Sequence, residues 1–491
     1  MKWRPKEALE EHDINKGLKL VIGDGLAAEV MTTFTGGAFL VALALLMGAS
    51  NFQIGLLAAL PTFTNLFQLL SIWLVRRFNN RRAVTVLSSL LARIPLVIIG
   101  ILPFAGDSAV SIQLLIFFLF FHYLFGSIAG PSWNSWMKEL VPENILGTYF
   151  SKRSSYTQAL NVALAIMLAL LLDFVRSRYP DFEINVYGIM FIIAGVIGII
   201  GAVILSFVQE PHSTMGHENI FQLFLQPLKD GNFQRLLSFN SVWNLAVNMA
   251  IPFFTVFMMK SLGLSLSYII GLNILSQVAS IFTIRIWGRL ADRYSNKTII
   301  ALSAPLYILC LIAWCFVGLY NYFYVNIILL AVIHIFMGMS MSGINLSITN
   351  LGLKLAPTKT AIVYLSARNM ILSVFGSIAP LIGGRLADYF TERSLLINVE
   401  WMSPKGEKIF HLVSLHDWNF LFLIGAGAAL VAVELLVHVK EVGEVDKDFV
   451  KRIMRHSIRT NLRDFFVIGT LISWHEQLWE IIKRRLLFRG P

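Results

Sequence analysis

Long apolar stretches, interrupted by short polar segments, run along most of the chain. A helix needs roughly 20 mostly apolar residues to cross about 30 Å of hydrocarbon. Twelve stretches meet this requirement, so the pattern predicts an all-α polytopic membrane protein. The predicted spans lie at 24–47, 52–75, 83–104, 111–133, 154–175, 187–208, 236–259, 266–288, 298–319, 322–350, 361–384 and 418–438.

The polar segments outside these spans define the organisation that we expect. The first 20 residues are polar and mixed in charge, and they lack the basic start and short apolar core of a cleaved signal peptide. The expected parts are a cytoplasmic N-terminal segment (1–20), a six-helix bundle (21–208), a central cytoplasmic linker (209–235), a second six-helix bundle (236–438) and a basic amphipathic cytoplasmic tail (439–491).

Composition and charge exclude a water-soluble enzyme and indicate an orientation. Of the 491 residues, 56% are apolar and 14% are charged, whereas soluble domains carry about 25% charged residues. With the N-terminus in the cytoplasm, the cytoplasmic segments hold 30 of the 40 Lys and Arg residues and the outer segments hold 7. Such a bias is typical of membrane topology. The net charge of +11 therefore gives no reason to expect nucleic-acid binding. We expect a multi-pass protein of a bacterial cytoplasmic (inner) membrane with both termini in the cytoplasm.

Short sequence matches recur at a nearly constant spacing. Ile54-Gly55-Leu56 matches Ile270-Gly271-Leu272 at a shift of 216. Leu140-Val141-Pro142, followed by Tyr149, Ser151 and Arg153, matches Leu355-Ala356-Pro357, followed by Tyr364, Ser366 and Arg368, at a shift of 215. Matches in register at nearly one shift predict two homologous six-helix halves.

One loop in the second half carries a recognisable motif. Gly288-Arg289-Leu290-Ala291-Asp292-Arg293, followed by Asn296-Lys297, resembles the signature loop of the major facilitator superfamily. The resemblance covers roughly residues 20–440 and includes Pro380 and Gly383-Gly384 in the eleventh span. It implies twelve transmembrane helices in two pseudo-symmetric six-helix bundles, with the first, fourth, seventh and tenth spans lining a central cavity. In the first half, Ile72 and Arg76 stand where the motif has Gly and Asp.

The resemblance also implies a cytoplasmic gate that closes the outward-facing state. Its candidate residues surround the signature loop and the start of the eleventh span, with an equivalent arginine in the first half; the alternative is a generic interfacial charge cluster. In the first half, Glu139 or Glu143 is the expected partner of the Arg76–Arg82 cluster. The gate candidates are Gly288, Asp292, Arg293, Lys297, Arg368 and Arg153.

The chain lacks the motifs of the common energy-converting and hydrolytic enzymes. No Gly-Lys dipeptide occurs, which excludes a phosphate-binding Walker loop, and Trp479 replaces the second histidine of a zinc-protease helix after His475-Glu476. We expect no cofactor and no metal. We predict secondary transport of a small organic solute, coupled to protons. We expect the protein to function as a monomer in the lipid bilayer.

Charged residues inside the spans are the first candidates for mechanism, because each costs at least about 2.5–3.5 kcal/mol in the bilayer centre. Glu29 and Asp24 lie in the first span and Arg93 in the third. We interpret them as a carboxylate–arginine pair whose protonation is coupled to transport, with Glu29 as the first choice. The alternative is a fixed ion pair that joins the two helices.

Polar side chains of four spans are the substrate-cavity candidates. Asn240, Asn244 and Asn248 recur every four residues, so they share one face of the seventh span. Interhelical hydrogen bonding is the alternative for this face. The histidines of spans four and ten are either proton carriers or packing residues. The full set is Asn240, Trp243, Asn244, Asn248, Thr32, Tyr123, His122 and His334.

Two other functions fit parts of the sequence. A proton-driven exporter of amphipathic compounds belongs to the same class of transporter. A polytopic enzyme, such as a lipid-linked transferase, would use the outer loop from Arg385 to Asp417, with Asp388, Glu392, His411, His416 and Asp417. The tail after the twelfth span carries 11 basic residues among apolar ones and is expected to lie on the anionic membrane surface.

Overall fold

Within the residues that it describes, the computed structural model has twelve helical segments long and apolar enough to span a membrane. The predicted all-α fold with twelve spans is therefore confirmed. The described residues are 5–7, 9–105, 111–212, 226–319, 322–357, 361–403 and 406–441.

The N-terminal bundle contains the first six spans. Its first span is broken into two helices at Gly36 and Gly37, and Gly37 has a φ of +56°, a conformation that residues with a side chain rarely adopt. The second span continues through a short 3₁₀ turn, Asn65–Phe67. The helices are α1 (Glu11–Thr35), α2 (Gly37–Leu46), α3 (Asn51–Thr64), α4 (Gln68–Phe78), α5 (Arg81–Ile101), α6 (Ile112–Leu140), α7 (Leu146–Arg178) and α8 (Glu183–Ser206).

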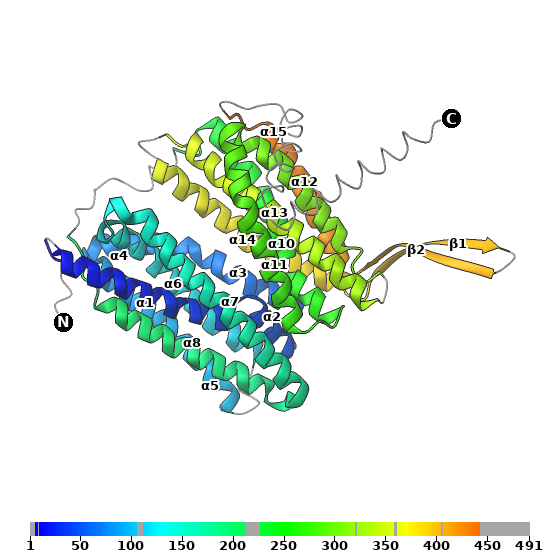
Figure 1. Ribbon diagram of the computed structural model, residues 1–491, viewed down its shortest axis with the longest axis horizontal. Coiled ribbons are helices and arrows are strands. Elements are labelled where there is room, and N and C mark those ends of the chain that lie inside the picture. Colours follow the sequence, from blue (N-terminus) through cyan, green and yellow to red (C-terminus); the bar gives the residue numbers. More distant parts are fainter. Residues whose placement is uncertain are drawn as a thin grey trace, which may run out of the picture.

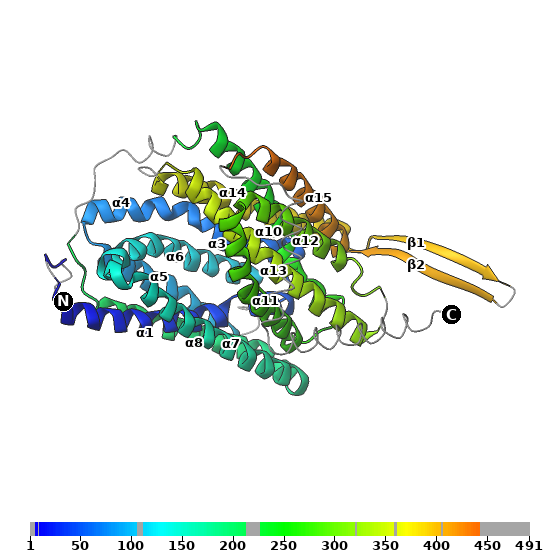
Figure 2. The same ribbon diagram turned by 45° about the horizontal axis from the view of Figure 1, so that its top comes forward.

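The C-terminal bundle contains the other six spans and an antiparallel hairpin that extends away from the helices (Figures 1 and 2). In the hairpin, Ser394 pairs with His416 at the base and Ser403 with Gly406 at the tip. The elements are α10 (Gly231–Lys260), α11 (Leu266–Arg293), α12 (Asn296–Trp314), α13 (Phe323–Leu355), α14 (Ala361–Phe390), β1 (Ser394–Ser403), β2 (Gly406–His416) and α15 (Trp418–Val437).

Several helices run past the apolar stretches that predicted them. The first span begins at Glu11 instead of 24, α13 ends at Leu355 instead of 350, and α14 ends at Phe390 instead of 384. The apolar stretch marks only the part of a helix that lies in hydrocarbon, and polar turns at its ends are solvated. The hairpin was not predicted. Residues 213–225 of the expected linker and 442–491 of the expected tail lie outside the described residues.

The two bundles lie side by side and pack together along two helix pairs, α3 with α14 and α7 with α11. In Figure 1 the N-terminal elements, blue to teal, occupy the lower left, and the C-terminal elements, green to orange, the upper right. We call the side on which α1 begins and α15 ends the terminal face. The other side, which carries the hairpin, is the opposite face.

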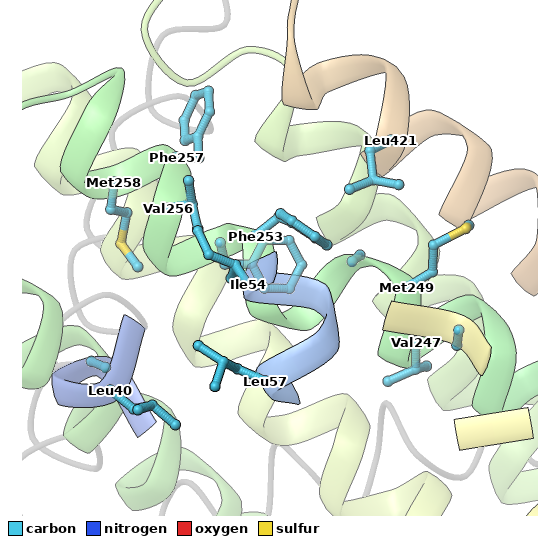
Figure 3. Close-up of a cluster of buried hydrophobic side chains, with 14 of the residues drawn as sticks. Leu40, Ile54, Leu57, Val247, Met249, Phe253, Val256, Phe257, Met258 and Leu421 are labelled. Carbon is cyan, nitrogen blue, oxygen red and sulfur yellow. The ribbon is translucent and has the colours of Figure 1, made fainter. Parts of the chain in front are cut away.

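Close backbone approach joins α3 to α14 near the opposite face. A Cβ atom at Gly55 would collide with the carbonyl oxygen of Pro380, and one at Gly384 would lie 2.7 Å from the Cα atom of Phe52. Small residues permit this approach, and packing of this kind drives helix association in lipid. Figure 3 shows apolar side chains of both bundles in the same cluster, among them Leu40, Ile54, Leu57, Phe253, Phe257 and Met258.

Two buried glutamates organise the terminal face in equivalent ways. Glu210, after α8, accepts the first two backbone N–H groups of α5 at 2.9 and 3.0 Å. Glu441, after α15, accepts those of α12 at 3.2 and 2.8 Å. Each also holds a cation, Arg81 at 3.0 Å and Lys354 at 3.0 Å. Arg81 also pairs with Glu139 at 2.8 Å, so that of the two expected partners of the Arg76–Arg82 cluster, Glu139 and Glu143, the structure shows Glu139 in this contact.

Candidate functional site

A central cavity of about 450 Å³ lies between the two bundles. The N-terminal bundle contributes α2, α3 and Tyr123 of α6, and the C-terminal bundle contributes α10, α11, α13 and Tyr307 of α12. The first, fourth, seventh and tenth spans thus all reach it, as the resemblance implied, together with three further helices. Most of its lining is apolar, including Leu40, Ile54, Leu57, Phe254, Met258, Met337 and Met341.

Only two of the eight predicted cavity residues line this central space, Tyr123 and His334. His334 Nδ1 lies 2.8 Å from the carbonyl oxygen of Leu330 in its own helix, and its ring packs against Trp314 at 5.6 Å between centroids. The Tyr307 hydroxyl group is buried without a hydrogen-bond partner among the described residues. The sequence analysis missed Tyr307, because one tyrosine in an apolar span gives no periodic signal.

The asparagine stripe of α10 makes contacts between and within helices. Asn244 donates its amide to the carbonyl oxygen of Leu372 in α14 at 2.7 Å, and Asn248 donates to the backbone carbonyl of Asn244 at 2.9 Å. Asn240 is buried. Trp243 packs against Tyr307 at 5.6 Å between ring centroids. The Asn244 contact is the interhelical hydrogen bond of the alternative interpretation, whereas the Asn240 amide has no hydrogen-bond partner among the described residues.

A second cavity, of about 500 Å³, opens beside the central one between α1, α7, α11 and α13. The two share Ser276 and Met341. Glu29 lines the second cavity and is partly exposed. Its carboxylate makes no hydrogen bond or ion pair with any described residue. Thr32 points its hydroxyl at carbonyl oxygens of its own helix, 3.1 Å away, and is not among the lining residues. The polar lining consists of Glu29, Gln158, Asn161, Ser276, Gln277, Ser280, Ser342 and Asn345.

A third cavity, of about 480 Å³, lies within the N-terminal bundle toward the terminal face. It shares Tyr123 with the central cavity, and His122 and Arg153 also line it. Asp24 and Arg93 face it as a buried pair, with Oδ1 and Nη2 4.0 Å apart. The structure thus pairs Arg93 with Asp24 and leaves Glu29 on another face of α1. His122 Nδ1 lies 2.7 Å from a backbone carbonyl oxygen of α5.

Contacts between the bundles close the opposite face. The Asp388 carboxylate of α14 accepts the first two backbone N–H groups of α3, both at 3.0 Å. The Asp173 carboxylate of α7 accepts the first two N–H groups of α11, both at 2.9 Å. The Arg385 guanidinium lies over the Phe52 ring at 4.7 Å. A carboxylate is stabilised at a helix N-terminus by the free N–H groups and the helix dipole.

The predicted gate residues lie toward the terminal face, where they make separate contacts. Asp292 and Arg293 are exposed at the end of α11, and Asp292 makes no hydrogen bond or ion pair with the residues that are described. Arg368 is buried in α14. Lys297 donates its Nζ to the carbonyl oxygen of Val437 at 3.0 Å. Gly288 is half-buried. Arg153 donates to the Val21 carbonyl oxygen at 3.4 Å and lies over the Trp133 ring.

Two carboxylates of the outer loop that an enzyme would use make structural hydrogen bonds. Asp388 caps α3, and Asp417 accepts the backbone N–H of Glu392 at 2.9 Å. The side chain of His411 lies outside the described part of the chain. Within that part, no group of three His, Cys, Asp or Glu side chains is placed to hold a metal ion.

Solved structures with the same arrangement of helices are transporters. The nucleoside transporter NupG has a TM-score of 0.61 at 13% identity, covering 87% of this chain and 99% of that one. A bacterial homologue of the human lysosomal transporter Spinster, in an inward-facing conformation, has a TM-score of 0.57 at 15% identity and covers 87% and 95%. An auto-inhibited POT family peptide transporter has a TM-score of 0.60 at 12% identity and covers 88% and 98%. At these identities the likeness establishes the fold.

The sequence match extends over most of the chain. No curated protein matches this chain. The family model of the Major Facilitator Superfamily matches residues 25–380, which include the cavity residues named above except Asp24. The predicted family and secondary transport are confirmed, and they indicate a transporter rather than an enzyme. The chain belongs to the Major Facilitator Superfamily.

Proposed function

We propose that the protein moves a small organic solute by alternating access through the central cavity, as a monomer, with its terminal face in the cytoplasm. The observation that carries the proposal is the cavity of about 450 Å³ that both bundles line. Specific small-molecule sites commonly have volumes of roughly 300–1,000 Å³. Since one chain supplies both sides of the cavity, no second copy is needed to build it.

The orientation rests on charge. The segments that the sequence predicts to be cytoplasmic hold 30 of the 40 Lys and Arg residues, and such an excess favours the cytoplasmic side. The contacts of Asp173 and Asp388 close the opposite face, and the two cavities that adjoin the central one lie toward the terminal face. This combination supports an inward-facing state.

Proton coupling is the energy source that we propose, with the Asp24–Arg93 pair as its site. Both side chains are buried, and Asp24 Oδ1 has no hydrogen-bond partner among the described residues. Protonation of Asp24 neutralises the carboxylate and removes its attraction for Arg93 across 4.0 Å. Because this pair joins α1 to α5 at a cavity that adjoins the central one, breaking it links the proton to helix packing. Glu29, the first choice from sequence, is the alternative site.

Transport in vesicles tests the proposal. The purified protein is reconstituted into liposomes, and uptake and efflux of pooled small solutes are followed under an imposed pH gradient. Wild-type protein should accumulate one or more solutes against their gradients. Asp24→Asn should abolish accumulation and spare downhill exchange, whereas Glu29→Gln should keep the dependence on the pH gradient. Unchanged coupling in Asp24→Asn, with loss in Glu29→Gln, would assign the proton to Glu29.

A further inference from the structure

The central cavity is suited to an apolar molecular body. Its lining contains Ile54 and Leu57 from one bundle, and Met258, Met337 and Met341 from the other. Methionine is flexible and polarisable, so a methionine-rich surface accommodates varied apolar shapes. A fully polar solute of this size would leave most of its hydrogen bonds unmade here, and each buried unpaired group is costly.

The adjoining cavity differs from the central one in its chemistry. Apart from Ile281, Gly338 and Met341, its lining residues carry hydroxyl, amide or carboxyl groups. Some of these groups are already paired: Asn161 donates to the Thr33 hydroxyl at 2.9 Å. Because the two cavities share Ser276 and Met341, one solute can occupy both, with an apolar part in one and a polar part in the other.

Glu29 is the one charged residue that lines the polar cavity, and no cation of the described chain pairs with it. Asp24 of α1, which pairs with Arg93 of α5, faces a different cavity. A carboxylate that lines a cavity among membrane-spanning helices and lacks a partner cation favours a bound positive charge. The amide oxygens of Gln158, Asn161 and Asn345, which line the same cavity, carry partial negative charge that is also favourable for a cation.

We propose that the transported solute is an amphipathic organic cation, with its apolar body in the central cavity and its positive group beside Glu29. This inference rests on the proposed transport function and names its substrate class. An anion of the same shape is disfavoured, because it would place a second negative charge next to Glu29.

Two ions of nearly the same size and shape but opposite charge test the proposal. Binding of radiolabelled tetraphenylphosphonium and tetraphenylborate to the purified full-length protein is measured in detergent, with excess unlabelled ion as the blank. Wild-type protein should bind the cation with saturation and at least tenfold more tightly than the anion. Glu29→Gln should weaken cation binding at least tenfold, whereas Glu29→Asp should retain much of the cation binding. Met337→Ala should weaken the binding of both ions.

Glu143→Gln is the matched control, because Glu143 is an exposed carboxylate on the terminal face; it should bind the cation as wild type does. Equal cation affinity of wild type and Glu29→Gln overturns the proposal, as does an anion affinity that equals that of the cation. The flux assay on pooled solutes separates the two levels. Gradient-driven flux without saturable cation binding refutes the substrate class and leaves transport standing, whereas absence of all flux refutes the transport function itself.

Discussion

Asp173 and Asp388 lie 215 positions apart, the spacing of the internal repeat, and each caps a helix of the other bundle. Asp388 of the C-terminal bundle binds the first turn of α3, and Asp173 of the N-terminal bundle binds the first turn of α11. The two contacts are therefore related by the pseudo-symmetry of the fold. Since both join the bundles on one face, both must break when that face opens.

Removing either carboxylate should open the opposite face more often. A capping side chain contributes about 0.5–2 kcal/mol, so Asp173→Ala or Asp388→Ala should shift the ratio of closed to open molecules about fivefold. Spin labels at Phe182→Cys and Lys260→Cys, both at exposed sites on that face, report the separation of the bundles. The two native cysteines, which are buried, are replaced by serine for this experiment.

Asp181→Ala provides the control, because Asp181 is an exposed carboxylate on the same face. It should leave the distance distribution as in wild type. A distribution that is the same in Asp173→Ala, Asp388→Ala and wild type would show that the two caps do not hold the face closed.

The contact of α3 with α14 should depend on Gly55. A Cβ atom there would collide with the carbonyl oxygen of Pro380, whereas a Cβ atom at Gly271, the matching glycine of the repeat, would have no atom of a packed neighbouring group within 4 Å. Gly55→Ala should separate the helices and shift the same spin-label distances toward the open form. Gly271→Ala should have no effect, and equal shifts in both variants would count against a specific contact.

The Asp24–Arg93 pair should show strong energetic coupling. Removing one member of a buried pair costs about 3–5 kcal/mol, because the other charge is left uncompensated. Asp24→Asn and Arg93→Gln should therefore each lower the melting temperature in detergent by several degrees. The double variant should recover part of the loss while pH-gradient coupling stays absent. Strictly additive losses in the double variant would mean that the two charges do not interact.

Glu441 should make stability depend on pH at the terminal face. Burial raises the pKa of this carboxyl, but hydrogen bonds from the Lys297 backbone, the Asn296 side chain and Lys354 outweigh it, so its pKa lies below the usual 4.5. A depressed pKa in the folded state means that Glu441 stabilises the protein above the ordinary pKa and loses this effect as pH falls through the depressed value.

Glu441→Gln should accordingly lower the melting temperature at neutral pH by several degrees and flatten its decrease in acid. Thermal unfolding in detergent between about pH 7 and about pH 3 measures both effects. Glu143→Gln, an exposed glutamate of the same face, should behave as wild type. A wild-type pH profile in the Glu441→Gln variant would contradict this role.

The sequence predicted the spans and the two halves because both depend on local composition and on repeated register. It predicted helix ends poorly, since Glu11 and Leu355 extend α1 and α13 beyond the hydrocarbon stretch. The charged candidates Glu29, Asp24 and Arg93 all line cavities, because a charge in a span needs water or a partner. Which carboxylate meets Arg93 depends on the rotation of α1, which periodicity does not specify.

Other features of the site depend on how distant helices pack against one another. The spacing of Asn240, Asn244 and Asn248 defines a face of α10, but it does not say which helix that face meets, and Asn244 meets α14. The repeat does contain a signal for Asp173 and Asp388, because the two aspartates lie 215 positions apart and each is followed by an aromatic residue. Their partners are backbone N–H groups of distant helices, and such partners leave no trace in residue type.

The central claim is that solute crosses through the cavity by alternating opening of the two faces. The most direct test is a reducible cross-link between Phe52→Cys and Arg385→Cys, whose parent side chains stack across the closed opposite face. In proteoliposomes under a pH gradient, cross-linking should abolish solute flux, and reduction should restore it to the level of the uncross-linked variant. Flux that continues unchanged through fully cross-linked protein would contradict the account.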